Sequence, residues 1–442
     1  MSKNKFKLNG VHLESNKLSA DIPISRMPAP KVVYIPLSQH IGKHTVSIVK
    51  VGDRVLKGQL IAKGGEIGDI SALVFSSVSG TVTGINIKRP SPSGIANHIQ
   101  IENDGLDELY TLPQLSTPTK EEIVQRVYEC GIVGMGGAGF PTHIKLNTEA
   151  SIDTLILNGV ECEPYITCDY RLMLEYTHAI LKGALYMAQC VDAKNIILSI
   201  KENDVLQAHL QSVISSDTRF QFVTIMPLES IYPLGGEKQL IYKVTGKKVP
   251  ARALPSQIGV VVSNVSTALA VRNAIEKGVS SFERVVTVTG KGVKKPCNVL
   301  VSNGTSIEDL LEYAEVDPST LVKLVVGGPM MGTAVNNVQL VTTKTMNCLL
   351  ALTAEETDYE VPSPCINCTL CSQACPMRLM PMFITKFGNA NDAANSAKYG
   401  AKDCIECGCC DFVCPAKIPL VSEIRNAKKM ITKEEKKSKI TY

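Results

Sequence analysis

The sequence contains no tryptophan, and aromatic residues make up only 5% of its 442 residues. Few side chains are therefore available to stack against nucleic-acid bases. A strong charge of either sign is also lacking, since the formal net charge is +4. Residues 421–442 hold seven basic and three acidic side chains, an excess of four, so the rest of the chain is close to neutral. Both absences argue against nucleic acid as a partner.

Long hydrophobic runs are absent as well. No stretch approaches the ~18 consecutive apolar residues of a membrane span, and residues 1–5 lead into no apolar segment typical of a secretory signal. The sequence therefore predicts a chain that neither crosses a membrane nor is exported. Its fifteen cysteines then indicate a reducing cytosol, in which most thiols bind metal rather than form disulfides.

Eight of the cysteines form two copies of the pattern C-x2-C-x2-C-x3-C-P, at 365–376 and 404–415. Bacterial ferredoxins bind [4Fe–4S] clusters with this spacing, and the fourth cysteine of each copy binds the cluster of the other copy. We therefore expect two sets of iron ligands: Cys365, Cys368, Cys371 and Cys414, and Cys404, Cys407, Cys410 and Cys375. A zinc site would instead pair C-x2-C with a distant second pair. Cys409 breaks the spacing, so we interpret it as a packed thiol or a neighbour that tunes the cluster.

Residues 1–110 contain short strand-like segments separated by tight turns. The segments 51–59 and 77–82 resemble lipoyl and biotinyl carrier domains, which hold a modified lysine on a hairpin between two such halves. The corresponding hairpin, at 66–71, has no lysine. We therefore expect a barrel-sandwich hybrid that serves as a scaffold. His40, His44 and His98 lie in or near it and are expected to be surface or core groups rather than ligands.

A glycine-rich loop follows a helix that Thr119 and Glu122 open with a capping box. The loop contains Gly134, Gly136, Gly137 and Gly139. It fits G-x-G-x-x-G but follows a helix rather than a strand, and no Gly-Lys-Ser/Thr closes it, so it is neither a Rossmann fingerprint nor a Walker loop. Without Cβ atoms its backbone could lie against a ligand and direct N–H groups at phosphate, with Lys145 adding a charge. A tight loop without a ligand is the alternative.

Residues 118–280 continue with alternating strands and helices, which predicts a parallel sheet covered on both faces. We expect strands at 154–157, 195–200, 222–225 and 259–263, and helices near 170–190, 204–214, 237–244 and 267–277. Ligands of such sheets bind beyond the carboxyl ends of the strands. Three polar segments fall at those ends, at 158–164, 232–238 and 263–267, and together with the glycine loop they predict one polar rim.

These motifs resemble the NADH- and FMN-binding subunit of respiratory complex I, and the order of all motifs resembles the RnfC family of Rnf complexes over nearly the full length. The resemblance implies FMN contacts from the glycine loop and from Lys145, Asn158, Cys162, Tyr232, Gly235, Asn264 and Thr267. It implies nicotinamide nucleotide contacts from Phe140, Glu163 and Glu237, and Glu161, in the same segment as Cys162, is also expected to bind a cofactor. Met135, Val160 and Gly236 depart from an arginine, an aspartate and a glutamate of the complex I family, which leaves details of flavin tuning open.

Three further regions complete the expected multidomain α/β and α+β architecture. Residues 283–346 resemble a β-grasp (SLBB) domain, with a capping box at 305–308, and Met330 and Met331 are expected to pack. Residues 360–420 form the two-[4Fe–4S] ferredoxin-like domain. Residues 421–442 are expected to continue as a basic amphipathic helix, either exposed to solvent or docked on an anionic membrane surface or an acidic partner.

The expected function is that of a peripheral electron-transfer subunit of a membrane ferredoxin:NAD oxidoreductase that translocates Na+ or H+. Its cofactors would be FMN, NAD(H) and two [4Fe–4S] clusters, and no side chain would be catalytic because the hydride passes to the flavin. Its partners would be the membrane subunits of the complex and, indirectly, ferredoxin, at the cytoplasmic side of the cell membrane. Two alternatives are a soluble NADH-dependent corrinoid reductase and a flavin-free electron relay or scaffold subunit.

Overall fold

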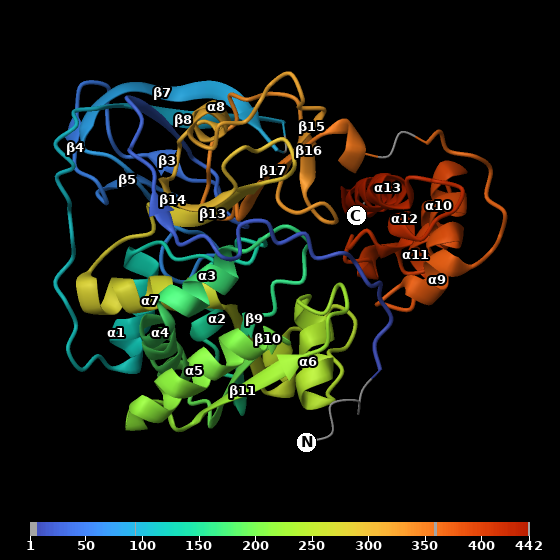
Figure 1. Cartoon of the computed structure of the whole chain (residues 1–442), viewed down its shortest axis with the longest axis horizontal. Helices are drawn as coiled ribbons and strands as arrows, with labels where there is room; N and C mark the ends of the chain where they lie inside the picture. Colours follow the sequence, from blue (N-terminus) through green and yellow to red (C-terminus); the bar gives the residue numbers. More distant parts are fainter. Residues whose placement is uncertain (1–6, 93, 358–359, 441–442) are drawn as a thin grey trace.

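The structure is a computed structural model that describes residues 7–92, 94–357 and 360–440. In this part of the chain the strands form four sheets. Figure 1 shows two β-rich parts at the top, a parallel-sheet part below them, and a helical part at one side that carries both cysteine runs. None of the described helices is both long enough and apolar enough to cross a bilayer.

The sandwich domain (residues 31–103) is built from two antiparallel sheets that share one core. The larger sheet contains β2 (Val32–Pro36), β8 (Gly94–Asn103), β7 (Gly80–Ser91) and β4 (Arg54–Val55), and the smaller contains β3 (Val46–Ser47), β5 (Leu60–Lys63) and β6 (Val74–Phe75). Side chains from both sheets are buried together, among them Ile35, Ile61 and Ile101. His98 is buried, and His40 bonds to its own loop through the Lys43 carbonyl at 2.9 Å.

The parallel-sheet domain (residues 118–280) contains a four-stranded sheet in the order β11-β10-β9-β12. Its strands are β9 (Thr154–Gly159), β10 (Asn195–Lys201), β11 (Val223–Leu228) and β12 (Val260–Asn264). Its helices are α1 (Lys120–Glu129), α2 (Thr142–Leu146), α3 (Cys168–Glu175), α4 (Thr177–Cys190), α5 (Asp204–Ser216), α6 (Glu237–Thr245) and α7 (Val265–Lys277), with short 3-10 turns η1 (Thr218–Phe220) and η2 (Pro255–Ile258). All strand pairings are parallel, as the alternating pattern predicts.

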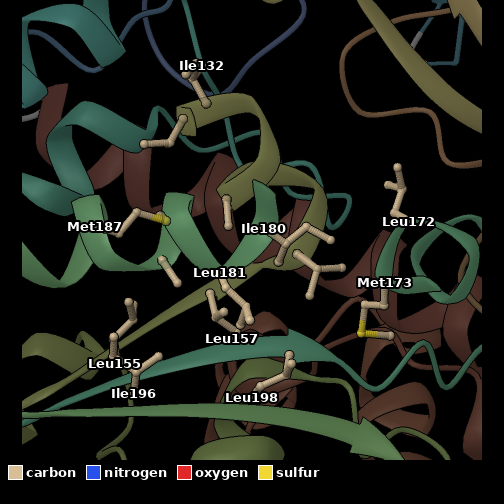
Figure 2. Close-up of a cluster of buried hydrophobic side chains, with 14 of the residues drawn as sticks. Ile132, Leu155, Leu157, Leu172, Met173, Ile180, Leu181, Met187, Ile196 and Leu198 are labelled. Atoms are coloured by element: carbon tan, nitrogen blue, oxygen red, sulfur yellow. The ribbon is translucent and has the colours of Figure 1, made fainter. Parts of the chain in front are cut away.

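Helices cover both faces of this sheet because successive side chains along a strand point to opposite faces, and both sets are apolar in β9. Leu155 and Leu157 of β9 belong to a core shared with α4 and α7, whereas Ile156 packs with α6. Figure 2 shows the first of these cores, in which α4 lies over β9 and β10. The labelled side chains of α4 are Ile180, Leu181 and Met187. The sheet edge that carries the site is therefore fixed by packing on both sides.

The helix predicted near 170–190 is two helices, because Tyr176 separates the end of α3 at Glu175 from the start of α4 at Thr177. Tyr176 has φ −128° and ψ 25°, outside the helical region. The Thr177 hydroxyl also donates to the Met173 carbonyl, a local side-chain bond of the kind that competes with regular helix geometry. The capping box at Thr119 and Glu122 is present as predicted.

The mixed-sheet domain (residues 283–352) holds a sheet in the order β1-β14-β13-β17-β15-β16. Its members are β1 (Ser25–Arg26), β13 (Glu283–Thr289), β14 (Cys297–Ser302), β15 (Lys323–Val326), β16 (Thr333–Val335) and β17 (Cys348–Leu352), with α8 (Ile307–Tyr313) and the following turn η3 (Ala354–Glu356). The capping box of α8 joins Ser306 and Asp309, one residue later than the predicted pair 305 and 308, because Ser306 takes the extended N-cap geometry. β17 lies beyond residue 346, the predicted end of this domain.

The cysteine-rich domain (residues 360–440) is helical in the described residues. It contains α9 (Leu370–Ala374), α10 (Pro381–Asn389), α11 (Ala393–Lys398), η4 (Ala401–Asp403), α12 (Cys409–Phe412) and α13 (Leu420–Ile440). The apolar face of α13 is buried against α10 and α11 through Ile424, Ala427 and Ile431. The predicted helix with one apolar face is therefore confirmed, and that face is core. The opposite side, which includes residues 425, 426, 429 and 432–437, is exposed, and its docking on a membrane or an acidic partner stays a prediction.

Candidate functional site

The glycine-rich loop presents an open stretch of backbone at the carboxyl edge of the parallel sheet. Its base is closed by bonds from Gly134 N to Phe140 O at 2.8 Å and from Gly139 N to Gly134 O at 3.2 Å. Gly137 and Gly139 have φ values of 119° and 66°, which L side chains rarely adopt. The amides of Gly136, Gly137 and Ala138 donate to no acceptor in the described part of the chain, and a Cβ on Gly137 would enter open space.

The sheet and the helix after it hold this loop in place. The Met135 amide donates to the Thr267 hydroxyl of α7 at 2.9 Å. A Cβ on Gly136 would lie 3.4 Å from the Asn264 side chain, so the backbone lies flat against the end of β12. Two predicted site residues, Asn264 and Thr267, thus contact the predicted loop directly.

Lys145 and Glu237 form an ion pair beside the loop. Lys145 follows the loop on α2, and its ammonium lies 3.1 Å from Glu237 Oε1 at the start of α6 and donates to the Val262 carbonyl at 2.9 Å. Both side chains are partly exposed. The pair therefore presents a partly exposed cation and anion between β12 and the start of α6, where either could exchange its partner for a ligand group.

The carboxyl ends of β9 and β12 bring the predicted asparagines together, because Asn158 and Asn264 are paired in the sheet register. The side-chain amide of Asn158 donates through Nδ2 to the Gly235 carbonyl at 2.8 Å, and this bond holds the 232–238 segment against the sheet. A Cβ on Gly235 would lie 2.9 Å from Cys162 Sγ, so this close approach requires a glycine. Burial raises the pKa of the Cys162 thiol to about 12, so the thiol stays protonated and packs.

Glu161 and Asp169 form a buried carboxylate pair below this edge. Glu161 Oε1 accepts from the Asp169 amide at 2.8 Å, and Asp169 accepts from Asn264 Nδ2 at 2.6 Å and from Ser266 Oγ at 2.7 Å. Burial raises the pKa of Glu161 to about 7 and raises that of Asp169. Cys168 lies within 4.8 Å of both carboxylates, but their oxygens already serve the hydrogen bonds that fix α3 and α7.

An N-terminal strap (residues 7–24) crosses the strand ends before the chain enters the sandwich domain. Its Lys17 donates to the carbonyls of Glu161 at 3.1 Å, Glu163 at 3.0 Å and Ile166. The ammonium also lies 3.9 Å from the Glu161 carboxylate. The strap therefore holds the 161–166 segment from outside, and Glu161 adopts a strained φ of 42° within it.

Glu163 points away from the glycine loop, toward the mixed-sheet domain. Its oxygens accept from the amides of Met330 at 3.1 Å and Met331 at 2.9 Å. A Cβ on Gly328 would lie 2.3 Å from Glu163 Oε2, so the 327–332 loop closes on the carboxylate. Burial raises the pKa of Glu163. In this structure Glu163 therefore joins two domains, and Met330 and Met331 contribute through their backbone.

Tyr232 connects the site edge to the cysteine-rich domain. Its hydroxyl donates to the Cys407 carbonyl at 2.7 Å and lies 3.4 Å from Glu163 Oε1, and the side chain is buried. Cys409 Sγ lies 3.9 Å from the Tyr232 carbonyl. Cys409 is a buried, packed thiol at this contact, which is one of the two roles predicted for it.

The second predicted set of iron ligands surrounds one cavity. Cys375, Cys404, Cys407 and Cys410 line a pocket with about 350 Å³ of open space, together with Cys409 and apolar side chains such as Ile384 and Ile424. Cys375 comes from the first run and the other three from the second, as the crossed pattern predicts. Four of these five thiols have the spacing of the repeated cysteine pattern, and they are a donor set that fits an iron–sulfur cluster.

The other set is more open. Cys365 and Cys368 are exposed, Cys371 is buried, and Cys414 is half-buried. Cys371 and Cys414 pack into the same apolar group as Leu420 and Val421, and this group also contains Cys410 of the second set, so the crossed pairing of the first run with Cys414 stays a prediction.

Sequence reasoning missed Lys17 and Asp169 as parts of the site. The sequence offers only a weak indication for Asp169, which is an acidic residue in the first turn of α3. Such residues are common because they interact favourably with the helix dipole, so they rarely mark a site. The sequence offers no indication for Lys17, because this residue lies about 145 residues before the carbonyls it binds.

Comparisons with known families agree with this geometry. Residues 5–106 match the model described as the RnfC barrel sandwich hybrid domain, residues 127–273 match the Nuo51 FMN-binding domain, and residues 285–334 match the SLBB domain. The three matches correspond to the sandwich, parallel-sheet and mixed-sheet domains, so these three fold predictions are confirmed.

Curated relatives match nearly the whole chain. The C subunit of the ion-translocating oxidoreductase complex of Rhodobacter capsulatus is 39% identical over 435 residues, covering 96% of this chain and 83% of the relative. The C subunit of the proton-translocating ferredoxin:NAD(+) oxidoreductase complex of Clostridium ljungdahlii is 39% identical over 387 residues, covering 86% of this chain and 83% of the relative. Among solved structures, an NAD+-reducing [NiFe]-hydrogenase is similar in fold, with a TM-score of 0.52 and 19% identity over 72% of this chain and 65% of that chain.

Proposed function

Because this chain belongs to the RnfC family, the C subunits of ion-translocating oxidoreductase complexes, we propose that it is the NAD(H)-dependent oxidoreductase subunit of such a complex. In this role it exchanges electrons between NAD(H), FMN and two [4Fe–4S] clusters. The observation that carries the proposal is the contact between the two sites: an FMN-binding type of domain reaches, through Tyr232, a pocket lined by five cysteines. The family favours this function over the corrinoid reductase that the sequence also allowed.

The glycine loop and the ion pair fit a phosphorylated flavin. Three loop amides, of residues 136–138, have no acceptor within the described chain, and such amides bind phosphate oxygens well. Lys145 lies beside them and can exchange Glu237 for a phosphate. When bound, a flavin supplies the conversion between two-electron hydride transfer and one-electron transfer to clusters.

The rest of the edge positions the two nucleotides. Asn158, Gly235 and Asn264 are proposed to line the flavin ring from a sheet edge that cannot shift, because the core packs on both sides. Phe140 closes the glycine loop and Glu237 begins α6, and both are proposed to contact NAD(H). No general acid is needed from the chain, since the residues need only orient the two rings and exclude water.

The same family membership supports the proposed surroundings. Relatives are named as subunits of complexes that translocate ions or protons. We infer that this chain works with the other subunits of such a complex, peripherally at the cytoplasmic side of the cell membrane, and reaches ferredoxin through them.

Anaerobically purified protein tests the proposal. We expect one FMN and about eight iron atoms per chain, and bleaching of the flavin absorbance when NADH is added. Lys145→Met should lose flavin. Lys120→Met is the control: it removes a partly exposed ion pair between Lys120 of α1 and Asp192 and should retain flavin. A chain that holds iron but binds no flavin would instead be an electron relay or scaffold.

A further inference from the structure

The two cysteine runs form a structural repeat as well as a sequence repeat. They are offset by 39 residues, and each opens a short helix, α9 in the first run and α12 in the second. Left-handed backbone recurs at the same offset, in three pairs: Asn367 and Glu406, Thr369 and Gly408, and Arg378 and Lys417. The two runs therefore curl in the same way, and equivalent positions can be compared directly.

Equivalent positions in the two runs meet different surroundings. Cys409 of the second run is 0% exposed and touches Tyr232, whereas its counterpart Leu370 is 41% exposed. Ile405 packs into the apolar group around Tyr232, whereas its counterpart Ile366 is 65% exposed. The parallel-sheet domain thus covers the second run and leaves the equivalent face of the first run open.

A continuous set of contacts leads from the flavin edge to the second run. Asn158 of β9 bonds to the Gly235 carbonyl at 2.8 Å, and Gly235 follows Tyr232 by three residues. The Tyr232 hydroxyl then donates to the Cys407 carbonyl at 2.7 Å. Residues 361–370, which begin the first run, are exposed throughout.

Resting on the proposed function, we propose an order for the two clusters. The cluster held by Cys404, Cys407, Cys410 and Cys375 exchanges electrons with the flavin, and the cluster held by Cys365, Cys368, Cys371 and Cys414 exchanges them with a redox partner protein of the complex. Tyr232 is the positioning residue of the first exchange, because it fixes the Cys407 backbone against the flavin edge. The chain therefore has one internal and one external cluster.

The electrons balance in either direction. Oxidation of NADH delivers a hydride, which carries two electrons, and the flavin takes up one further proton from solvent. Those electrons leave singly, so that each cluster passes from its 2+ to its 1+ state and back once per electron. The redox partner accepts both electrons in two steps, and the two flavin protons return to solvent. In the NAD+-reducing direction every step reverses.

Single-run variants of the full chain test the order. Cys365→Ser removes a ligand of the external cluster, and Cys404→Ser removes one of the internal cluster. Each variant is photoreduced anaerobically with a deazaflavin, the light is switched off, and NAD+ is mixed in. Freeze-quench electron paramagnetic resonance then follows the reduced cluster that remains. We expect Cys365→Ser to keep a rapid NAD+-dependent loss of its cluster signal, and Cys404→Ser to lose that rapid phase.

Iron and flavin contents separate the possible failures. Each variant should retain about four iron atoms and its flavin. If Cys365→Ser does not, Cys414→Ser takes its place, because it removes a different ligand of the same cluster. Cys375→Ser takes the place of Cys404→Ser in the same way. Equal rates in the two variants, or a faster rate in Cys404→Ser, would overturn the order while leaving the proposed function intact. Absence of flavin or of about eight irons in the wild type would instead overturn the proposed function.

Tyr232 provides an independent measurement. Tyr232→Leu should slow the same signal loss in the Cys365→Ser background, and Tyr232→Phe, which keeps the ring but loses the hydroxyl that donates to the Cys407 carbonyl, should slow it as well. A role limited to folding would change cluster content rather than this rate. If Tyr232→Leu leaves the rate unchanged with full iron and flavin, Tyr232 does not set the internal exchange.

Discussion

Replacement of Lys17 is the most direct test of how the site edge is held. The Lys17 ammonium is the only strap group whose bonds reach three carbonyls of the 161–166 segment in the described residues, those of Glu161, Glu163 and Ile166. Its side chain is 21% exposed, so solvent can only partly replace it. Lys17→Met keeps the apolar stem and removes all of these bonds at once.

The expected cost follows from the bonds that are lost. A hydrogen bond from a charged group contributes about 1.5–3 kcal/mol, and contributions within one group are not additive, so we expect about 3 kcal/mol for the set. Local opening of the segment should become easier by this amount, which corresponds to about 100-fold. Hydrogen exchange measures the opening directly, through the protected amides of Tyr165, which donates to Ser15, and Asp169, which donates to Glu161.

A matched lysine separates this local effect from general damage. Lys120→Met removes a surface pair with Asp192, whose side chain is 84% exposed, and surface pairs contribute little. Exchange at Tyr165 and Asp169 should then stay as in the wild type. If Lys17→Met also leaves both amides as protected as before, the strap does not stabilise the segment and this reasoning is refuted.

Three further outcomes are expected. Burial raises the pKa of the Glu161 carboxyl from 4.5 to about 7, so between these values the carboxyl is protonated in the folded protein and ionised in the unfolded chain. The stability of the wild type therefore falls as pH rises through this window. The melting temperature of Glu161→Gln, measured relative to that of the wild type, should rise from about pH 5 to about pH 8. Cys409→Ala should keep the iron content of the wild type, whereas Cys410→Ala should lose about four atoms. Gly139→Ala, at φ 66° and with a Cβ 2.9 Å from Thr345, should bind FMN roughly tenfold more weakly in a flavin titration, since left-handed backbone costs an L residue about 1–2 kcal/mol.

Local patterns explain what could be predicted from the sequence. The strands near 154, 195, 222 and 259 lie where the apolar runs place them, and the two central strands of the sheet, β9 and β10, are buried along most of their length. The position of Cys375 beside the second run also followed from spacing alone. In these cases the signal lies within a few residues of the feature it predicts.

Contacts between distant segments explain the rest. The bond from Tyr232 to Cys407 spans 175 residues, and the bond that Glu163 accepts from Met330 spans 167. A tyrosine and a glutamate are also common in ligand sites, so the residue type alone could not show that these two side chains join domains. The apolar spacing of α13 correctly predicted a helix with one apolar face, but it carried no information about α10 and α11, which cover that face. A periodic pattern shows that a face is covered without showing what covers it.

The sandwich domain illustrates how a scaffold can act without a prosthetic arm. Its Ile41 amide donates to the Gly139 carbonyl at 3.1 Å, so one of its loops closes directly on the glycine loop. Lys344, buried and with a pKa lowered to about 7 by burial, donates to Gly131 O at 2.7 Å and to Leu73 O at 2.6 Å. The sandwich domain is thus bonded directly to the Gly139 end of the loop, and Lys344 of the mixed-sheet domain joins it to Gly131, just before the loop. A loop with several glycines is costly to order, and a fixed neighbour at each end lowers the entropy that a bound cofactor would otherwise have to offset.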